Sequence, residues 1–553
     1  MNSRTVTADK RYLLLPLTGV GGWFVAPEKM QYLSIYSDGR KTEEYEIQLS
    51  GDPAFWGAVY LDAYKGREIT VTLENGDESL LEMVKLSDET AEGAKLYREP
   101  GRPLIHFTPA RGFMNDPNGL TYYRGTYHFF GQLNPYGLSM GNTHWMHAVS
   151  TDLMHWEEKP YALLPDEMGR MYSGGGVVDT ENTSGLKCGD DDPIFLFYTA
   201  AGCKTRWAQG VPFTICCAYS LDGGNSFVKY SGNPLFPHQS WLNRDPKVLW
   251  NPDDREWMLM FYRDGDRYTL FFSKDLLHWE EGETVRGYNS AECPDMFYLN
   301  LDGDPEKRKL VLWFCSDNYQ VGTMRNRRFC PEAGVVDGPS HQLYSDFPNH
   351  ARTAGGYASQ TFTNLPEGRV VQFGWLMVHP QGESFVSSMT VPNELKLVST
   401  PKGMRLSVLP VKELETMEEK RFAFVNRGLE EFSRIPRDAF GEAFELDLTL
   451  TCRPDQVHAI SVKNVLIVYD AHLGRLILPS GAYEVSMPEG KFELKVIADR
   501  TSLEIYTGDG LFNTAVKSLA PGSPWEAPLK VVYVEPDTGV DCTVRSFKSM
   551  WDK

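Results

Sequence analysis

Apolar and polar residues alternate along most of the chain, in short runs that end at turns. In the first hundred residues, Tyr32–Tyr36 precedes Asp38-Gly39, and Ile69–Leu73 precedes Asn75-Gly76. Asp-Gly and Asn-Gly between alternating runs are hairpin signals, because both dipeptides tolerate the left-handed turn conformation. We therefore expect residues 1–99 to form a small N-terminal β module.

A strand-turn-strand pattern recurs five times in the middle of the chain. Repeated all-β units of about 50 to 70 residues are typical of a β-propeller, so five hairpins predict a five-bladed propeller over residues 100–405. A large β-sandwich is the alternative. The five predicted hairpins are Leu120–Gly131, Val177–Ala200, Val248–Arg263, Met296–Ser316 and Thr361–Leu376.

The last part of the chain alternates again without this repeat. Phe444–Leu450 and Phe492–Ala498 are alternating runs, and Pro488-Glu489-Gly490 is a turn between strands. This pattern predicts a C-terminal β-sandwich over residues 406–553. Three domains agree with a length of 553 residues, since a domain usually has roughly 100 to 200.

Composition narrows the classes of partner. A formal net charge of −19 argues against nucleic acid and anionic membranes, which attract basic surfaces, and is compatible with a neutral carbohydrate. The nine cysteines have no C-x-x-C spacing, so neither a disulfide framework nor a zinc site is indicated. We therefore expect a cytoplasmic protein, and a secreted protein whose signal peptide has been removed is the alternative. No apolar run is long enough to cross a membrane.

Three acidic residues each lie close to a proline between apolar runs: Asp116 in Asn115-Asp116-Pro117-Asn118-Gly119, Asp245 in Arg244-Asp245-Pro246, and Glu292 in Glu292-Cys293-Pro294. Such a turn holds a carboxylate at the end of a strand. Asp116 and Glu292 are 176 positions apart (292 − 116), so only a closed architecture brings them together. The central channel of a propeller does so, and two carboxyl groups are what cleavage of a glycosidic bond requires. Arg244 favours the ionised form of Asp245, whereas Glu292 has no adjacent cation in the sequence.

In this order, the three motifs resemble the signature of the family 32 glycoside hydrolases, the invertase, inulinase and levanase group. Further stretches that resemble the family are Tyr127–Pro135, His144–Ser150, Tyr172–Gly175 and Phe373–Trp375. The resemblance spans roughly residues 104 to 550. It implies a five-bladed propeller followed by a β-sandwich, with no metal and no cofactor.

The resemblance also assigns roles. It implies that Asp116 is the nucleophile, Glu292 the general acid/base and Asp245 the stabiliser of the transition state. Met140 stands where many members carry a tryptophan, so one wall of the sugar site is either softer or supplied by another part of the chain. The implied substrate contacts are Asn115, Gln132, Met140, Tyr172, Ser173, Arg244 and Trp375.

Three histidines, His128, His144 and His147, invite a metal-site interpretation. Strand alternation places His144 and His147 on opposite faces, and no carboxylate completes a usual ligand set. Structural or hydrogen-bonding histidines are therefore favoured over a metal site.

Together these observations predict a retaining glycosidase that releases terminal β-linked fructose from sucrose, fructo-oligosaccharides or fructans. Within the same family, an endo-acting levanase or inulinase and a fructosyltransferase are alternatives. An inverting five-bladed glycosidase of the arabinanase and xylosidase type and a non-catalytic fructan-binding propeller are the alternatives outside it. The N-terminal module is expected to pack against the enzyme or shape its substrate site, rather than act as a separate carbohydrate-binding module.

Overall fold

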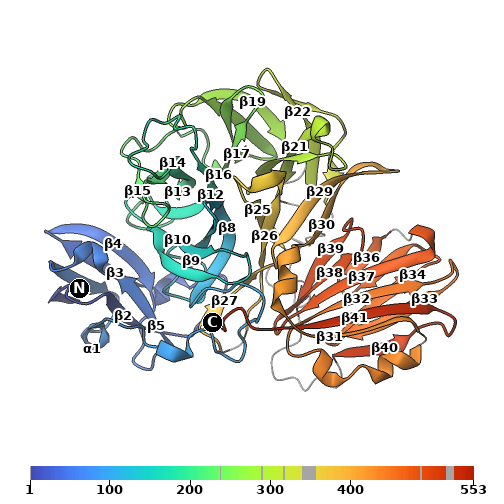
Figure 1. The fold of residues 1–553 in the computed structure, drawn as a ribbon. Helices are drawn as coiled ribbons and strands as arrows, with labels where there is room; N and C mark the ends of the chain where they lie inside the picture. Colours follow the sequence, from blue (N-terminus) through green and yellow to red (C-terminus); the bar gives the residue numbers. More distant parts are fainter. Residues whose placement is uncertain are drawn as a thin grey trace.

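Strands dominate the fold, which confirms the all-β prediction, and they form three bodies that follow one another along the chain (Figure 1). The computed structural model describes residues 2–236, 238–287, 291–315, 318–338, 356–380, 382–427, 429–485, 488–517 and 528–552. In these ranges, no helix has the length and apolar character needed to cross a bilayer.

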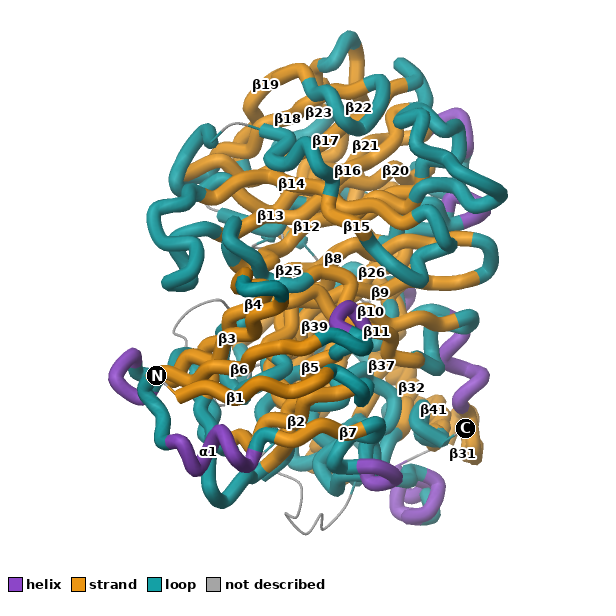
Figure 2. The backbone as a smooth tube through the Cα atoms, turned by 90° about the vertical axis from the view of Figure 1, so that its left-hand side faces the viewer, coloured by secondary structure: helices purple, strands orange, loops and turns teal. Residues whose placement is uncertain are grey.

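The N-terminal module consists of two antiparallel sheets that enclose a small apolar core, which includes Leu15, Leu33 and Val71. The first sheet has the order β1 (Asn2–Thr7), β6 (Glu68–Glu74), β3 (Gln31–Ser37) and β4 (Arg40–Ile47), and the second has the order β5 (Phe55–Tyr60), β2 (Tyr12–Leu17) and β7 (Lys85–Ser87). In Figure 2 the first sheet lies directly below the propeller. Short helices are α1 (Glu78–Met83), η1 (Pro27–Lys29), η2 (Asp62–Tyr64) and η3 (Gly93–Lys95).

Residues 112–410 form the five blades of the propeller, and each predicted hairpin supplies the two innermost strands of one blade. Ser316, the last residue of the fourth hairpin, lies outside the described residues. The blades are β8 (Gly112–Tyr123), β9 (Thr126–Asn134), β10 (His144–Ser150) and β11 (Glu157–Leu163); β12 (Arg170–Val178), β13 (Ile194–Ala201), β14 (Phe213–Ser220) and β15 (Val228–Lys229); β16 (Arg244–Asn251), β17 (Glu256–Asp264), β18 (Arg267–Ser273) and β19 (Glu280–Arg286); β20 (Asp295–Asn300), β21 (Arg308–Phe314), β22 (Asn318–Arg325) and β23 (Arg328–Pro331), with β24 (Val336–Asp337); and β25 (Tyr357–Thr361), β26 (Val371–Leu376), β29 (Asn393–Thr400) and β30 (Gly403–Pro410), with β28 (Ser388–Met389).

The ring closes where the fifth blade meets the first. β25 packs beside β8, and β27 (Phe385–Val386) pairs in parallel with the start of β8. β30 pairs with β29 along its whole length. The boundary expected at residue 405 therefore falls inside the last strand of the propeller, and we place it after Pro410.

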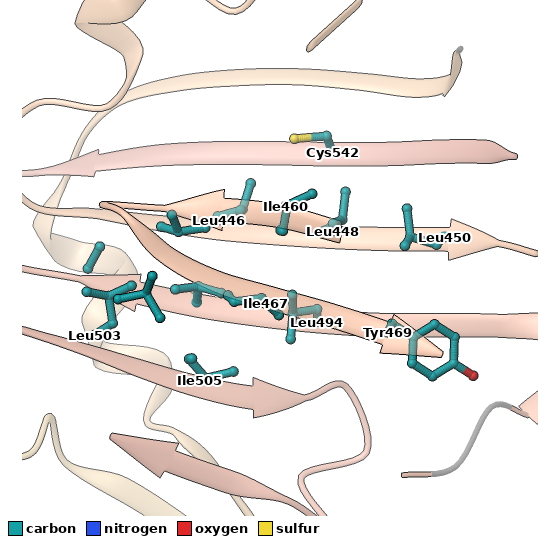
Figure 3. Close-up of a cluster of buried hydrophobic side chains, with 14 of the residues drawn as sticks. Leu446, Leu448, Leu450, Ile460, Ile467, Tyr469, Leu494, Leu503, Ile505 and Cys542 are labelled. Carbon is teal, nitrogen blue, oxygen red and sulfur yellow. The ribbon is translucent and has the colours of Figure 1, made fainter. Parts of the chain in front are cut away.

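The C-terminal sandwich encloses a large apolar core, part of which is drawn in Figure 3. Leu446, Leu448 and Leu450 alternate along β32 (Phe444–Thr451) and meet Ile460 and Ile467 from the facing sheet. One sheet has the order β31 (Glu418–Arg427), β41 (Gly539–Phe547), β32 (Phe444–Thr451), β37 (Lys491–Ala498), β38 (Ser502–Thr507) and β39 (Asn513–Lys517), and the other has the order β36 (Gly481–Glu484), β35 (Arg475–Leu478), β34 (Val465–Asp470), β33 (Val457–Val462) and β40 (Leu529–Tyr533). The short helices that follow residue 300 are η4 (Pro305–Lys307), η5 (Pro366–Gly368), η6 (Lys412–Met417), η7 (Leu429–Arg434), η8 (Arg437–Ala439) and η9 (Pro488–Gly490).

A buried ion-pair cluster joins the sandwich to the segment that leads into the propeller. His106 Nδ1 lies 2.8 Å from Asp499 Oδ2, and His106 Nε2 lies 2.9 Å from Glu504 Oε1. Asp499 also accepts hydrogen bonds from the backbone N–H groups of Leu104 and Ile105. Burial lowers the pKa of His106, but its two carboxylate partners outweigh burial and raise the pKa to about 9. Hydrogen bonds and the charge of His106 likewise outweigh burial and lower the pKa of Asp499 to about 2.

We expect His106→Ala to destabilise the protein by about 3 to 5 kcal/mol, because it leaves two buried carboxylates without their cation. The raised pKa of His106 stabilises the fold fully below about pH 6.5, and this contribution is lost as the pH rises through about 9. Thermal unfolding followed at pH 6 and pH 10 should therefore show a large difference between wild type and variant at pH 6 and a smaller one at pH 10. An equal difference at both pH values would contradict a charged His106.

Candidate active site

The innermost strands of the propeller begin at the same end of the channel, and four of them carry a register shift near their first residues. The shifts lie between Met114 and Pro117, Tyr172 and Gly174, Arg244 and Lys247, and Tyr357 and Gln360. A bulge of this kind turns a side chain away from the alternation of the strand. Asp116, Ser173 and Asp245 all lie within such shifts.

Asp116, Asp245 and Glu292 line one cavity of about 460 Å³, a volume typical of small-molecule sites. Nine of the ten site residues expected from the sequence line it, and the exception is Ser173. The lining residues are Trp23, Asn115, Asp116, Gln132, Met140, Tyr172, Cys203, Lys204, Phe213, Trp241, Leu242, Arg244, Asp245, Glu292, Tyr357 and Trp375.

Asp116 is held by a set of polar donors. Ser173 Oγ donates to Asp116 Oδ2 at 2.6 Å, and Gln132 Nε2 approaches the same oxygen at 3.3 Å. Asn115 Nδ2 lies 3.3 Å from Asp116 Oδ1 and donates to Gln132 Oε1 at 2.7 Å. The carboxylate is therefore oriented from both sides.

Ser173 differs from its expected place. It is almost completely buried and lies behind Asp116, where it receives a hydrogen bond from Gln132 and donates one to the carboxylate. We therefore assign it to positioning Asp116 rather than to contacting the substrate directly.

Asp245 is the most enclosed of the three acids. Its Oδ2 accepts a hydrogen bond from the backbone N–H of Cys293 at 2.9 Å and lies 3.5 Å from Arg244 Nε. Burial raises the pKa of Asp245, Arg244 lowers it and the charge of Glu292 raises it, with a result of about 7. The effect expected of Arg244 is present, but burial outweighs it.

Glu292 has a cation beside it that the sequence does not reveal. Arg244 Nη2 donates to Glu292 Oε2 at 3.0 Å, so one guanidinium contacts two of the three acids. Tyr357 donates its hydroxyl to Glu292 Oε1. Asp245 and Glu292 both have a φ of 63°, a left-handed backbone that costs a non-glycine residue about 1 to 3 kcal/mol and that clusters at functional sites.

Sequence reasoning missed several residues of the cavity. Tyr357 and Phe213 carry no motif, although both line the cavity. Tyr357 begins β25, the innermost strand of its blade, whereas Phe213 begins β14, the third strand of its blade. Trp241 also carries no sequence motif. It lines the cavity and is 65% exposed. Trp23 comes from the N-terminal module, outside the stretch that carried the resemblance.

The three histidines lie outside this cavity. His128 Nδ1 and His147 Nε2 are hydrogen-bonded at 3.1 Å, while His144 contacts the backbone carbonyl of Asn142. Burial lowers the pKa of His128 to about 4, and burial likewise lowers that of His144 to about 3, which favours neutral rings. Within the described residues, no group of three or more His, Cys, Asp or Glu side chains is placed to hold a metal ion.

The titration of Asp116 gives a testable pH dependence. Burial raises its pKa, the Ser173 hydrogen bond lowers it and the charge of Glu292 raises it, with a result of about 6. The nucleophilic role that the sequence predicts for Asp116 requires the ionised carboxylate, so we expect kcat/KM to fall as the pH drops below about 6.

Ser173→Ala removes a donor to the ionised carboxylate and should move this acidic limb to higher pH by about one unit. Ser184→Ala is the matched control, because Ser184 donates to Asp179 in the same blade and does not line the cavity. An acidic limb that stays in place in Ser173→Ala would show that Asp116 does not control it.

Sequence comparison matches this chain to one family model and to several known enzymes. Residues 106–410 match the family model of the glycosyl hydrolases family 32 N-terminal domain. The chain is 32% identical over 477 residues to a levanase of Bacillus subtilis (strain 168), covering 78% of this chain and 68% of the levanase. It is 35% identical over 343 residues to an invertase of Schizosaccharomyces pombe (strain 972 / ATCC 24843), covering 56% of this chain and 58% of the invertase.

The fold comparison agrees. The crystal structure of an exo-inulinase from Aspergillus awamori superposes with a TM-score of 0.69 at 24% identity, covering 82% of this chain and 100% of the other. At that identity the likeness shows the fold.

Proposed function

This chain belongs to glycoside hydrolase family 32 and is a glycosidase, and we propose that it releases terminal β-D-fructofuranosyl units from sucrose, fructo-oligosaccharides or fructans with retention of configuration. The observation that carries the proposal is the presence of Asp116, Asp245 and Glu292 in one cavity. The names of the relatives, a levanase and an invertase, support a fructosyl substrate.

In the first step, Asp116 attacks the anomeric carbon of the fructosyl unit while Glu292 gives its proton to the oxygen of the departing sugar. The bond to that oxygen breaks, and a covalent fructosyl ester forms on Asp116. Ser173 and Gln132 hold the attacking carboxylate in one orientation, which reduces the motion that the reaction must otherwise restrict.

In the second step, Glu292 takes a proton from water, the water oxygen attacks the anomeric carbon, and Asp116 leaves as a carboxylate. Glu292 thus recovers its proton and the configuration is retained. Arg244 contacts Glu292 and Asp245 and can stabilise the negative form of each. We assign Asp245 to holding sugar hydroxyls, whose hydrogen bonds strengthen as positive charge develops on the ring.

The first experiment is a time course of products from sucrose, inulin and levan, each with wild type and with Asp116→Asn. Fructose alone from the earliest points, abolished by the substitution, is the expected result. Early oligosaccharides would instead indicate an endo-acting or transferring enzyme, and no product from any of the three would contradict a fructan or sucrose substrate.

The stereochemistry separates this proposal from an inverting glycosidase. NMR of the first product from sucrose should show the β-anomer of fructose before mutarotation. An initial α-anomer would mean that water, rather than Asp116, attacks the anomeric carbon.

The state of the cysteine thiols is relevant to the compartment in which the enzyme works. All nine cysteines are free in the structure, and Cys216, Cys217 and Cys293 are buried. This supports our proposal of a reducing compartment such as the cytoplasm. Detection of the native enzyme in cell fractions tests it, and recovery in the medium would contradict it.

A further inference from the structure

A loop of the N-terminal module reaches the mouth of the active site. Gly21 forms a parallel bridge with Leu138, and the carbonyl of Trp23 accepts a hydrogen bond from the N–H of Met140 at 3.2 Å. A Cβ at Gly21 would lie 2.8 Å from the ring of His379, so the loop packs closely against the propeller. The position of Trp23 is therefore set by contacts on both sides of the domain boundary.

The side chain of Trp23 forms part of the cavity wall. It stacks on Trp375 with ring centroids 6.0 Å apart and planes at 16°, and it meets Phe113 edge to face at 5.8 Å. Trp375 is only 3% exposed, whereas Trp23 is half-buried. Trp23 thus adds a larger accessible aromatic surface to the wall that the propeller begins with Trp375.

The propeller contributes Met140 to the same wall, beside the backbone that bonds Trp23. Methionine is flexible and adapts to many shapes, so it defines the wall poorly. An indole is flat and rigid, and its electron-rich face attracts the C–H groups of a sugar ring. Tyr172 and Phe213 also line the cavity and meet each other edge to face.

The module is held against two blades, so this wall is a fixed part of the structure. Asn142 bonds the backbone of Glu46 twice, accepting from its N–H at 2.8 Å and donating to its carbonyl at 2.6 Å. From the second blade, Arg206 forms ion pairs with Glu44 at 2.9 Å and Glu74 at 2.7 Å. Figure 2 shows the sheet that carries Glu44 and Glu46 on the side facing the propeller.

We propose that Trp23 is a substrate-binding residue whose indole face packs on the C–H face of the bound sugar, which makes the N-terminal module an integral part of the active site. The proposal rests on the proposed function, since it needs a fructosyl substrate in this cavity. It explains how a propeller with Met140 at this position still presents an aromatic wall to a sugar.

The test compares Trp23→Ala, Trp23→Phe and the control Trp56→Ala in the full chain. Trp56 belongs to the same module, is half-buried and lies outside the cavity, so its removal reports the effect of disturbing the module alone. For sucrose and a fructo-oligosaccharide, Trp23→Ala should lower kcat/KM about 10- to 100-fold, mainly through KM, because a well-packed tryptophan contributes strongly to binding.

Trp23→Phe should recover most of the lost kcat/KM, since it keeps an aromatic face, and the acidic limb of the pH profile should stay in place in both variants. Binding of sucrose to Asp116→Asn and to Asp116→Asn with Trp23→Ala, measured by calorimetry, should show the same loss without turnover.

Two results would overturn the proposal. One is a Trp23→Ala enzyme whose KM equals that of wild type. The other is a loss in Trp56→Ala as large as that in Trp23→Ala, which would attribute the effect to the fold of the module. A wild-type enzyme inactive on every fructosyl substrate would instead contradict the proposed function, and the two failures are therefore distinguishable.

Discussion

Asp116→Asn is expected to lower kcat on sucrose by about 10⁴- to 10⁶-fold, the largest effect of any single substitution in the chain. An amide cannot form the ester intermediate, and the residual rate comes from Glu292 and the remaining contacts in the cavity. The structure gives the substitution little steric cost, because asparagine has nearly the same shape and can still accept from Ser173. The measurement is kcat on sucrose together with thermal unfolding of the same samples.

The matched control is Asp190→Asn, because Asp190 is an exposed residue of the second blade and does not line the cavity. It should keep wild-type kcat. Asp116→Asn should also still bind sucrose, since Asp245, Arg244 and Gln132 remain in place. A variant that folds, binds and turns over at more than a hundredth of the wild-type rate would exclude Asp116 as nucleophile.

Glu292→Gln is expected to lower kcat on sucrose by about 10²- to 10⁴-fold, the usual contribution of general acid and base catalysis. Glutamine can still interact with Arg244 and Tyr357, so the loss reports the missing proton rather than a collapsed site. The loss should depend on the leaving group. A fructosyl donor with a good leaving group needs no protonation, so its first step should be nearly as fast as in wild type.

With such a donor, Glu292→Gln should accumulate the fructosyl ester on Asp116, because water then lacks its base. Intact-mass measurement detects the adduct, and azide, a nucleophile that needs no base, should restore turnover. Glu306→Gln, at an exposed glutamate of η4, is the control and should behave as wild type. Equal losses for good and poor leaving groups, with no rescue by azide, would show that Glu292 is not the acid/base.

Much of this protein follows from local sequence. Alternation and turn residues located the five inner hairpins, because a strand and its hairpin partner are close in the chain and each leaves its own signal. The three acids that we propose as catalytic could be selected from the sequence for the same reason. Each is tied to a proline in a short motif, and the repeat of the blades implied that all three face one channel. The edge of the propeller was missed by five residues, since β30 looks like any other alternating strand.

Contacts between distant segments were decided by the tertiary structure alone. Arg244 reaches Glu292 across 48 positions, Ser173 reaches Asp116 across 57, and Tyr357 reaches Glu292 across 65. Their geometry depends on bulges and on the packing of neighbouring blades, which no local pattern records. The same holds for the balance of burial and charge that raises the pKa of Asp245.

Trp23 is the clearest example of a residue whose place in the cavity the local sequence does not predict. The sequence determined that a small β module precedes the propeller and that Met140 leaves one wall of the site in question. Which residue completes that wall depended on how two domains dock, through Asn142, Arg206 and the loop at Gly21. Hydrophobic alternation and turn chemistry act within a segment and can be read from it, whereas a surface shared by two domains exists only once both have folded and met.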